Sequence, residues 1–243
     1  MTGIEELYRI VADAKKIVFF GGAGVSTESG IPDFRSADGL YNTEYAYPPE
    51  TILSHGFFFS NTEEFYRFYK SKMLYLGAEP NACHIKLAEL EKAGKVSAVA
   101  TQNIDGLHQK AGSEAVFELH GSVLRNFCVR CGRFYPVDAV VSREGVPLCD
   151  CGGVIKPDVV LYGETLDTEV VSGVIRRIAD ADVLIVGGTS LGVYPAAGLV
   201  NYFNGNSLVL INKTETHLDS SADLVIRESI GEVFSKIETR RYG

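Results

Sequence analysis

The stretch GGAGVSTESGIPDFR, which runs from Gly21 to Arg35, decides the fold of this 243-residue chain. It follows the apolar run Ile17-Val18-Phe19-Phe20, which predicts a short buried strand. Glycines at a strand end let the backbone approach a ligand closely, and the N-terminus of a following helix favours a phosphate. The spacing departs from the full G-x-G-x-x-G fingerprint, because Thr27 stands where the third glycine would fall. The stretch therefore predicts a nucleotide site with an incomplete fingerprint.

The tail of this stretch strengthens that prediction. Asp33 and Arg35 follow Pro32, which opens a loop. A charged cluster in a loop beside a glycine turn suits a polar ligand better than it suits a protein core. We therefore expect the loop to contribute to the same site as the glycines.

Short apolar runs recur along the chain and alternate with helical patterns. Strands are predicted at 96–100, 116–119, 159–162, 182–186, 207–212 and 224–226. Helices are predicted at 4–15, 63–76, from 80 to a C-cap at Gly94, at about 168–179 and at the C-terminus. This alternation is typical of an α/β fold, a doubly wound parallel sheet of Rossmann-like type.

Several of the predicted strands end in small or polar residues. Ligands of open α/β sheets bind outside the carboxyl ends of the strands, so these residues are expected to converge on one site. A single such turn has a purely structural explanation, but five together favour a binding site. They are Gly21-Gly22, Gln102-Asn103, His120, Gly188-Thr189-Ser190 and Asn212.

Composition excludes some classes of function. The net charge of −8 argues against a direct grip on nucleic acid through phosphate neutralisation, although it leaves basic protein substrates open. No apolar run reaches the roughly 18 residues that would span a bilayer, and the N-terminal residues lack a signal-peptide pattern. We therefore expect a cytoplasmic protein without a membrane partner.

Four of the five cysteines predict a structural zinc site. Cys128 and Cys131 are separated by two residues, and Cys149 and Cys151 follow after a gap of 17 residues. Thiolates in closely spaced pairs are ligands that zinc prefers, and a site with four cysteines is closed to substrate. The polar segment around them is expected to depend on the metal to fold. Cys83 stands apart, and a buried apolar role is favoured there over a reactive thiol.

Residues 36–76 lie between the glycine stretch and the helix predicted from residue 80. Residues 36–62 show no clean period and predict a functional loop with short helical turns. The helix at 63–76 carries many aromatic residues, which favour either a core or the wall of an apolar channel. They include Phe65, Tyr66, Phe68 and Tyr69.

Taken together, these motifs resemble the signature set of the sirtuin (Sir2) family, in its bacterial type. The resemblance covers nearly the whole chain, and its motifs are specific in combination. It rests on residues 22–26, 32–35, 101–105, 119–121, 156–160, 162–164 and 188–190, on Asn212 and on the four cysteines.

The resemblance implies an NAD-dependent protein-lysine deacylase with a dinucleotide-binding domain and a smaller zinc-bearing domain formed by insertions. We expect residues 1–35, 78–121 and 158–243 in the NAD-binding domain. Residues 36–77 would form the helical part of the small domain and 122–157 its zinc ribbon. NAD would contact Gly22, Ala23, Gly24, Thr27, Asp33, Phe34, Arg35, Gln102, Asn103, Ile104, Asp105, His120, Gly188, Thr189, Ser190, Asn212 and Ile230.

The resemblance also implies the catalytic roles. His120 would be the general base, since a histidine titrates in the right range, and Asn103 would orient the ribose and water. A lone histidine is more often structural, but the position of His120 at a strand end among the other motifs favours catalysis. Residues Val159, Val160, Leu161 and Tyr162 would pair with the backbone of an acetyl-lysine-containing protein as an added strand. His55, His84, His108 and His217 are assigned no role.

The acyl group is predicted from two positions on the aromatic helix. Relatives selective for succinyl and malonyl groups grip the acyl carboxylate with a tyrosine and an arginine three residues later. Tyr66 matches that tyrosine and is expected to contact substrate, but Tyr69 stands at the arginine position. A carboxylate without a cation in an aromatic channel is costly to desolvate, so neutral acyl groups are favoured, acetyl first.

Two alternatives to a deacetylase that releases nicotinamide and O-acetyl-ADP-ribose stay open. The first is ADP-ribosyl transfer to a protein, and the second is a non-catalytic module that senses NAD. The presence of Asn103, Asp105 and His120 together speaks against the second.

Overall fold

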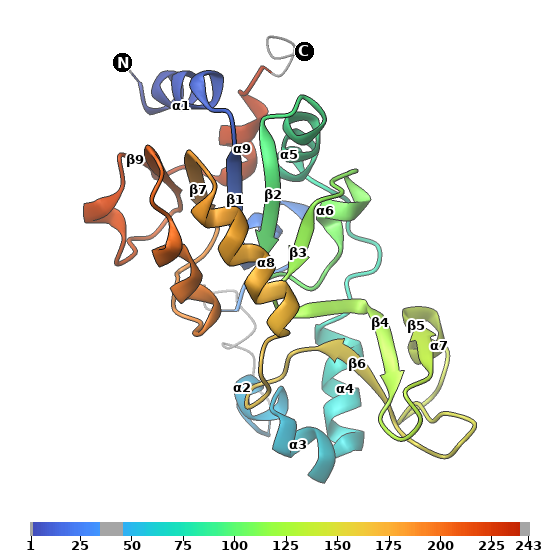
Figure 1. Cartoon of the computed structure of the whole chain (residues 1–243). Helices are drawn as coiled ribbons and strands as arrows, with labels where there is room; N and C mark the ends of the chain where they lie inside the picture. Colours follow the sequence, from blue (N-terminus) through green and yellow to red (C-terminus); the bar gives the residue numbers. More distant parts are fainter. Residues whose placement is uncertain (1, 35–45, 239–243) are drawn as a thin grey trace.

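The computed structural model describes residues 2–34 and 46–238, and its main feature is a parallel sheet of six strands (Figure 1). Every neighbouring pair of strands is parallel, which confirms the predicted fold class. The strand order is β3-β2-β1-β7-β8-β9. The bounds are β1 Ile17–Gly21, β2 Val96–Thr101, β3 Val116–Glu118, β7 Val183–Gly187, β8 Ser207–Ile211 and β9 Leu224–Ile226.

The strand order reverses between β1 and β7. From β1 the chain builds β2 and β3 on one side, and it then returns to place β7, β8 and β9 on the other side. A crevice opens outside the carboxyl ends of two strands that diverge in this way, and ligands of open α/β sheets bind there. The glycine stretch follows β1 and the Gly188-Thr189-Ser190 turn follows β7, so both lie at this point.

Helices cover both faces of the sheet, as a doubly wound fold requires. Along β1, Ile17 and Phe19 pack on one face with α1 (Gly3–Asp13), α5 (Ala82–Lys92) and α9 (Ile230–Ser235). Val18 and Phe20 pack on the other face with α8 (Thr168–Ala179) and the 3₁₀ segment η4 (Ala196–Tyr202). Short helical turns complete this part: α6 (Leu107–Lys110), η1 (Ala23–Val25), η2 (Thr27–Ser29) and η5 (Asp219–Ser221).

A smaller unit lies at the end of the molecule remote from α1 and α9 (Figure 1). It contains an antiparallel sheet in the order β5-β4-β6 and the helices of residues 49–72, which share one apolar core. Its elements are α2 (Pro49–Ile52), α3 (His55–Ser60), α4 (Thr62–Lys72), β4 (Gly121–Cys128), β5 (Phe134–Pro136), α7 (Val137–Val141) and β6 (Ile155–Val159).

Three predicted elements differ from the structure. The apolar run at 159–162 is not a strand of the large sheet, because β6 ends at Val159 and pairs antiparallel with β4. The aromatic helix ends at Lys72 and not at 76. The helix predicted from residue 80 begins at Ala82, because the Asn81 side chain accepts from the Cys83 amide as its N-cap.

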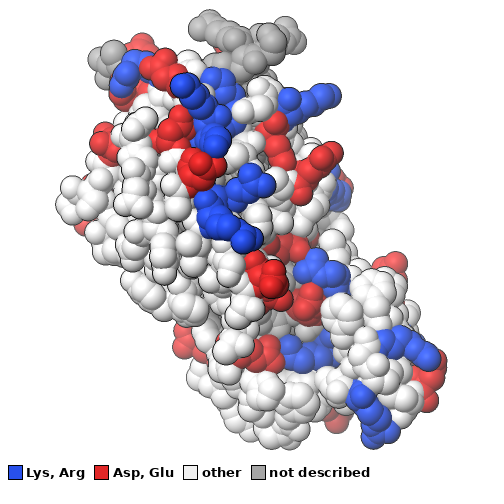
Figure 2. Space-filling model, viewed as in Figure 1, with Lys and Arg blue, Asp and Glu red and all other residues white. Residues whose placement is uncertain are grey.

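The surface agrees with the composition. Basic and acidic side chains are interspersed on the face shown in Figure 2. Within the described ranges 2–34 and 46–238, no helix is long and apolar enough to cross a membrane.

Candidate active site

A cavity of about 690 Å³ lies outside the carboxyl ends of the large sheet and extends to the small unit. The ends of β1, β2, β7 and β8 all contribute to its wall, together with the segment after β6. The structure therefore brings most of the predicted site residues together. They are Ala23, Gly24, Thr27, Asp33, Phe34, Gln102, Asn103, Ile104, Asp105, His120, Val159, Val160, Leu161, Tyr162, Gly188, Thr189, Ser190, Asn212 and Ile230.

Glycines allow the turns after β1 and β7 to pack directly against each other. The Gly24 amide donates to the Gly188 carbonyl at 2.8 Å, and a Cβ on Gly24 would lie 2.9 Å from that oxygen. Gly188 has a φ of +59°, which other residues rarely adopt. Gly22 does not line the cavity, but a Cβ there would lie 2.7 Å from the Cβ of Thr189. These glycines thus allow two backbone turns to pack closely against each other. The third glycine of the fingerprint, whose place Thr27 takes, is not needed for this contact.

A chain of hydrogen bonds crosses the floor of the cavity. The Asn103 side-chain nitrogen donates to the Ser26 hydroxyl at 3.0 Å, and that hydroxyl donates to Asp105 at 2.7 Å. The second carboxylate oxygen of Asp105 accepts from the Leu107 amide at 2.9 Å. Because Asn103 and Ser26 are buried, these bonds fix the amide and the carboxylate in one orientation.

His120 presents a basic nitrogen to the cavity. Its Nδ1 lies 2.9 Å from the Gln102 carbonyl oxygen, which can only accept, so Nδ1 carries the proton. The neutral ring therefore has an unprotonated Nε2. Burial lowers the pKa of His120 below its ordinary value, and the hydrogen bond to Gln102 offsets only part of that effect. The ring is consequently neutral at physiological pH and can accept a proton.

Two further histidines are buried nearby in a way that the sequence did not reveal. The rings of His84 on α5 and His108 on α6 lie 4.7 Å apart between their centroids. The Asn81 amide donates to Nδ1 of His84, while Nε2 of His84 and both ring nitrogens of His108 have no hydrogen-bond partner among the described residues. Burial lowers the pKa to about 4 for His84 and to about 3 for His108, so both are neutral.

Other cavity residues were also missed. Ser26 lies inside the quoted stretch, but only the folded chain brings it between Asn103 and Asp105. A serine immediately after the glycine turn was the available signal. Part of the wall comes from segments without a motif, including Lys72, Met73, Val193, Tyr194, Lys213, Thr214 and Glu228.

Besides Gly22, two predicted residues are not placed in the cavity. Arg35 lies outside the described residues. Tyr66 does not line this cavity, because its ring packs edge-on against Phe65 and Tyr69 and its hydroxyl donates to the Ile155 carbonyl of β6. A contact between Tyr66 and substrate stays a prediction, while in the structure the residue joins α4 to the small sheet.

The four cysteines form a cluster suited to zinc, as the sequence predicts. Their sulfur atoms all lie within 4.8 Å of one another. The Cys128–Cys151 and Cys131–Cys149 sulfur distances are 3.5 and 3.6 Å. A zinc–sulfur bond of about 2.3 Å makes the edge of a tetrahedral site about 3.8 Å, so the cluster has nearly the required size. Its four thiolates leave no position for substrate, and the site is structural.

The sequence and the fold are shared with known proteins. The family model described as "Sir2 family" matches residues 22–195. A protein of Clostridium acetobutylicum named NAD-dependent protein deacetylase is 57% identical over 238 residues, which cover 96% of this chain and 97% of that protein. A protein of Clostridium perfringens with the same name is 59% identical, with coverages of 96% and 98%.

Solved structures agree with these relatives. A Sir2 variant described with a deacetylated p53 peptide and 3′-O-acetyl ADP ribose has a TM-score of 0.88 and is 40% identical, over 95% of each chain. A Sir2 structure described with a p53 peptide and NAD⁺ has a TM-score of 0.85 at 40% identity, over 99% of this chain and 97% of the other. The family model that matches most of the chain, the identity to these relatives and the shared fold show that this chain belongs to the Sir2 family.

Proposed function

We propose that this protein is an NAD-dependent protein-lysine deacetylase that yields nicotinamide, deacetylated lysine and O-acetyl-ADP-ribose. The observation that carries the proposal is the unprotonated Nε2 of His120 in one cavity with the fixed Asn103 and Asp105. The deacetylase name of relatives more than half identical, and a related structure described with a deacetylated peptide, support it.

The donor set of the cavity fits NAD. The polar backbone turns after β1 and β7 suit the pyrophosphate of NAD. Asn212 can form hydrogen bonds to the adenosine half, and Ile230 can pack against it by apolar contact. Gln102, Asn103, Ile104 and Asp105 would hold the nicotinamide riboside half. NAD supplies the ribose carbon to which the acyl oxygen bonds as nicotinamide leaves. The further cofactor contacts proposed are those of Ala23, Gly24, Thr27, Asp33, Phe34, Arg35, His120, Gly188, Thr189 and Ser190, with Gly22 acting through close packing.

His120 would act as the general base. A ribose hydroxyl must lose a proton for the acyl group to transfer, and Nε2 of a neutral imidazole accepts it. The Gln102 carbonyl keeps the proton on Nδ1, and it stabilises the ring once both nitrogens are protonated. Asn103, held by Ser26, would orient the ribose and the water molecule in a site whose apolar walls exclude bulk solvent.

Residues 159–162 would bind the backbone of the substrate peptide. They line the cavity, and Tyr162, at 41% exposure, is the most exposed of these four residues. A peptide lying beside them as an added strand would direct its acyl-lysine toward His120. Sequence specificity would be broad, because pairing to the backbone reads no side chains.

Acetyl-lysine is the proposed substrate, and neutral acyl groups are favoured over charged ones. The cavity wall contains apolar residues such as Phe34, Val123 and Met73, and Tyr69 stands at the position where relatives selective for charged acyl groups have an arginine. Lys72 also lines the cavity, but it is engaged in an interaction of its own. A panel of acetyl- and succinyl-lysine peptides with NAD, read by mass, tests this preference. Acetyl-lysine should have the higher catalytic efficiency, and equal efficiency on succinyl-lysine would overturn the preference.

ADP-ribosyl transfer to a protein is the alternative that the same residues support. Incubation with NAD labelled in its ADP-ribose half separates the two. Label should leave as a small molecule in amounts that match the deacetylated peptide, whereas label that stays on protein would favour the transferase.

We further propose the domain division expected from the sequence, with residues 36–77 and 122–157 as the two insertions that build the small unit. The cores support it, because the small unit has one of its own. The cytoplasmic location and the absence of nucleic-acid binding stay predictions.

A further inference from the structure

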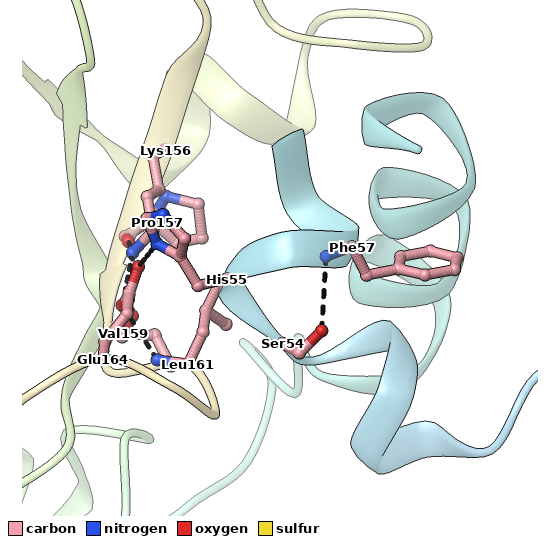
Figure 3. A network of polar contacts seen from close by, with 8 residues as sticks. All are labelled: Ser54, His55, Phe57, Lys156, Pro157, Val159, Leu161 and Glu164. Carbon is pink, nitrogen blue, oxygen red and sulfur yellow. Dashed lines mark hydrogen bonds and ion pairs between the residues drawn. The ribbon is translucent and has the colours of Figure 1, made fainter. Parts of the chain in front are cut away.

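The segment after β6 is held by a network of charged side chains that the proposed reaction does not use. Figure 3 shows Glu164 between Lys156 and the ring of His55, which come from β6 and α3. One carboxylate oxygen lies 2.9 Å from Nδ1 of His55, and the other lies 3.0 Å from Nζ of Lys156. Because a carboxylate only accepts, Nδ1 of His55 carries a proton.

The Glu164–Lys156 pair holds the backbone on both sides of Val160. The Leu161 amide donates to Glu164 at 2.9 Å, and Nζ of Lys156 donates to the Val159 carbonyl at 3.0 Å. Lys156 also reaches the Pro157 carbonyl at 3.3 Å. Two side chains joined to each other thus fix the peptide groups that precede and follow one cavity residue.

His55 connects residues 159–162 to the helices of the small unit. The His55 amide donates to the Tyr162 carbonyl, and the Tyr162 amide donates to the Leu53 carbonyl, each at 2.9 Å. Ser54 and Tyr162 form a parallel bridge. The His55 ring, through Glu164, links these bonds to the Lys156 pair.

The Lys156–Glu164 pair is shielded from solvent enough for the attraction between its charges to be appreciable. The side chains of Lys156 and Glu164 are 18% and 20% exposed, whereas His55 is 52% exposed. Burial acts to raise the pKa of Glu164, but the Leu161 amide, His55 and Lys156 outweigh it and hold that pKa below its ordinary value. Glu164 is therefore ionised at neutral pH, and its bonds to the backbone are charge-assisted.

We propose that Glu164, with Lys156 and His55, is a positioning residue that fixes residues 159–162 and thereby orients the Val160 carbonyl, which accepts no hydrogen bond among the described residues, toward the acyl-peptide backbone. The inference rests on the proposed function of this segment and deepens it. None of the three side chains needs to touch the reacting atoms. They act on peptide affinity, because a segment held in its bound conformation loses less entropy when the peptide pairs with it.

The test is a split between the kinetic constants for the two substrates. Glu164→Gln and Lys156→Met should each raise the KM for an acetyl-lysine peptide roughly tenfold, the loss of about one charge-assisted hydrogen bond. The kcat at saturating peptide and the KM for NAD should stay within about twofold of wild type. The double variant should cost little more than either single one, since the residues act together.

Two further variants and one control make the test decisive. Lys156→Arg keeps the charge and the donors and should retain the wild-type KM for peptide. His55→Phe, at the exposed edge, should give a smaller rise of about twofold to threefold. Asp180→Asn, which breaks the exposed Lys16–Asp180 pair far from the segment, is the matched control and should change no kinetic constant.

The outcomes separate the inference from the function on which it rests. If the wild type deacetylates the peptide and the Glu164 and Lys156 variants keep its KM, or change the KM values for peptide and NAD together, the positioning role is wrong and the deacetylase stands. If these variants only lower the melting temperature, the network is structural and the inference is again wrong. A wild type that forms no deacetylated peptide would overturn the proposed function and this inference with it.

Discussion

At the scale of single residues, His120 carries the proposed chemistry. Its place at a strand end could be predicted from the sequence, but its tautomer could not, because the Gln102 carbonyl that fixes it is set by the fold. Tyr66 is a different case. A sequence match predicts a substrate contact there, and this stays a prediction, whereas the rotation of α4 about its axis turns the side chain onto β6. Rotation depends on packing across the small unit, which a local motif does not encode.

Replacement of His120 by alanine should abolish deacetylation and leave the fold intact, while NAD affinity falls only by the loss of one contact. The ring nitrogen accepts the proton, and the side chain makes one hydrogen bond to Gln102 that the fold can lose. Deacetylation rates, melting temperature and NAD affinity check this expectation. A near-wild-type rate would remove His120 from the role of base.

Ser26 is expected to matter although it was not among the predicted site residues. Ser26→Ala removes the hydroxyl between Asn103 and Asp105, so it leaves a buried amide without its acceptor at a cost of about 1–3 kcal/mol. We expect a lower melting temperature, together with a lower kcat because Asn103 loses its orientation. Thr27→Ser, which keeps a hydroxyl on the next residue, is the control. Wild-type kinetics in Ser26→Ala would show that the hydrogen-bond chain does not serve the reaction.

At the scale of elements, the strands of the large sheet were the part of the fold that the sequence predicted best. A parallel strand covered on both faces appears as an unbroken apolar run, and β1, β7 and β8 show this pattern. The same rule misplaced residues 159–162, since an apolar run does not tell which sheet it joins. It also could not give the strand order, which follows from packing. On α5, the sequence predicted the helix and the buried Cys83, but it did not predict that His84 is buried beside it.

The zinc cluster should stabilise the small sheet. Its thiolates join the turn after β4 to the turn before β6, and the strands around them are short. Cys128→Ala, or treatment with a strong chelator, should therefore lower the melting temperature sharply and lose activity through unfolding. Cys83→Ala is the matched control, because that thiol lies on α5 away from the cluster. A Cys128→Ala protein that melts normally would contradict the structural role.

The buried histidines of α5 and α6 should make the fold sensitive to acid. Burial depresses the pKa of His84 to about 4 and of His108 to about 3, whereas the unfolded value is 6.5. As pH falls below 6.5, these histidines bind protons in the unfolded chain but not in the folded chain. Their contribution to the free energy of unfolding is therefore fully present above pH 6.5 and is lost progressively toward pH 4 and below.

Melting temperatures across pH 7 to 4 measure this loss. His108→Phe should flatten the acid side of the profile, because phenylalanine fills a similar space and does not titrate. His217→Phe, at a position outside this pair, should leave the profile unchanged. An acid profile in His108→Phe identical to that of the wild type would contradict the account.

At the scale of the whole molecule, the cavity requires both units. The large sheet provides the turns after β1 and β7 and the base at His120, while the segment after β6 and the end of α4 close the other side. The sequence could predict the members from the large sheet, since strand ends carry a recognisable pattern. It could not predict Lys72, Val193 or Glu228, which reach the cavity only through the packing of distant segments.

The central claim is that one cavity moves an acyl group from lysine to the ADP-ribose part of NAD. The most direct measurement is a product balance, in which purified protein, NAD and an acetyl-lysine peptide are incubated and analysed by mass. The account predicts equal amounts of nicotinamide, deacetylated peptide and O-acetyl-ADP-ribose. Deacetylated peptide formed with free acetate and without NAD consumption, or nicotinamide released without any acetylated ADP-ribose, would contradict it.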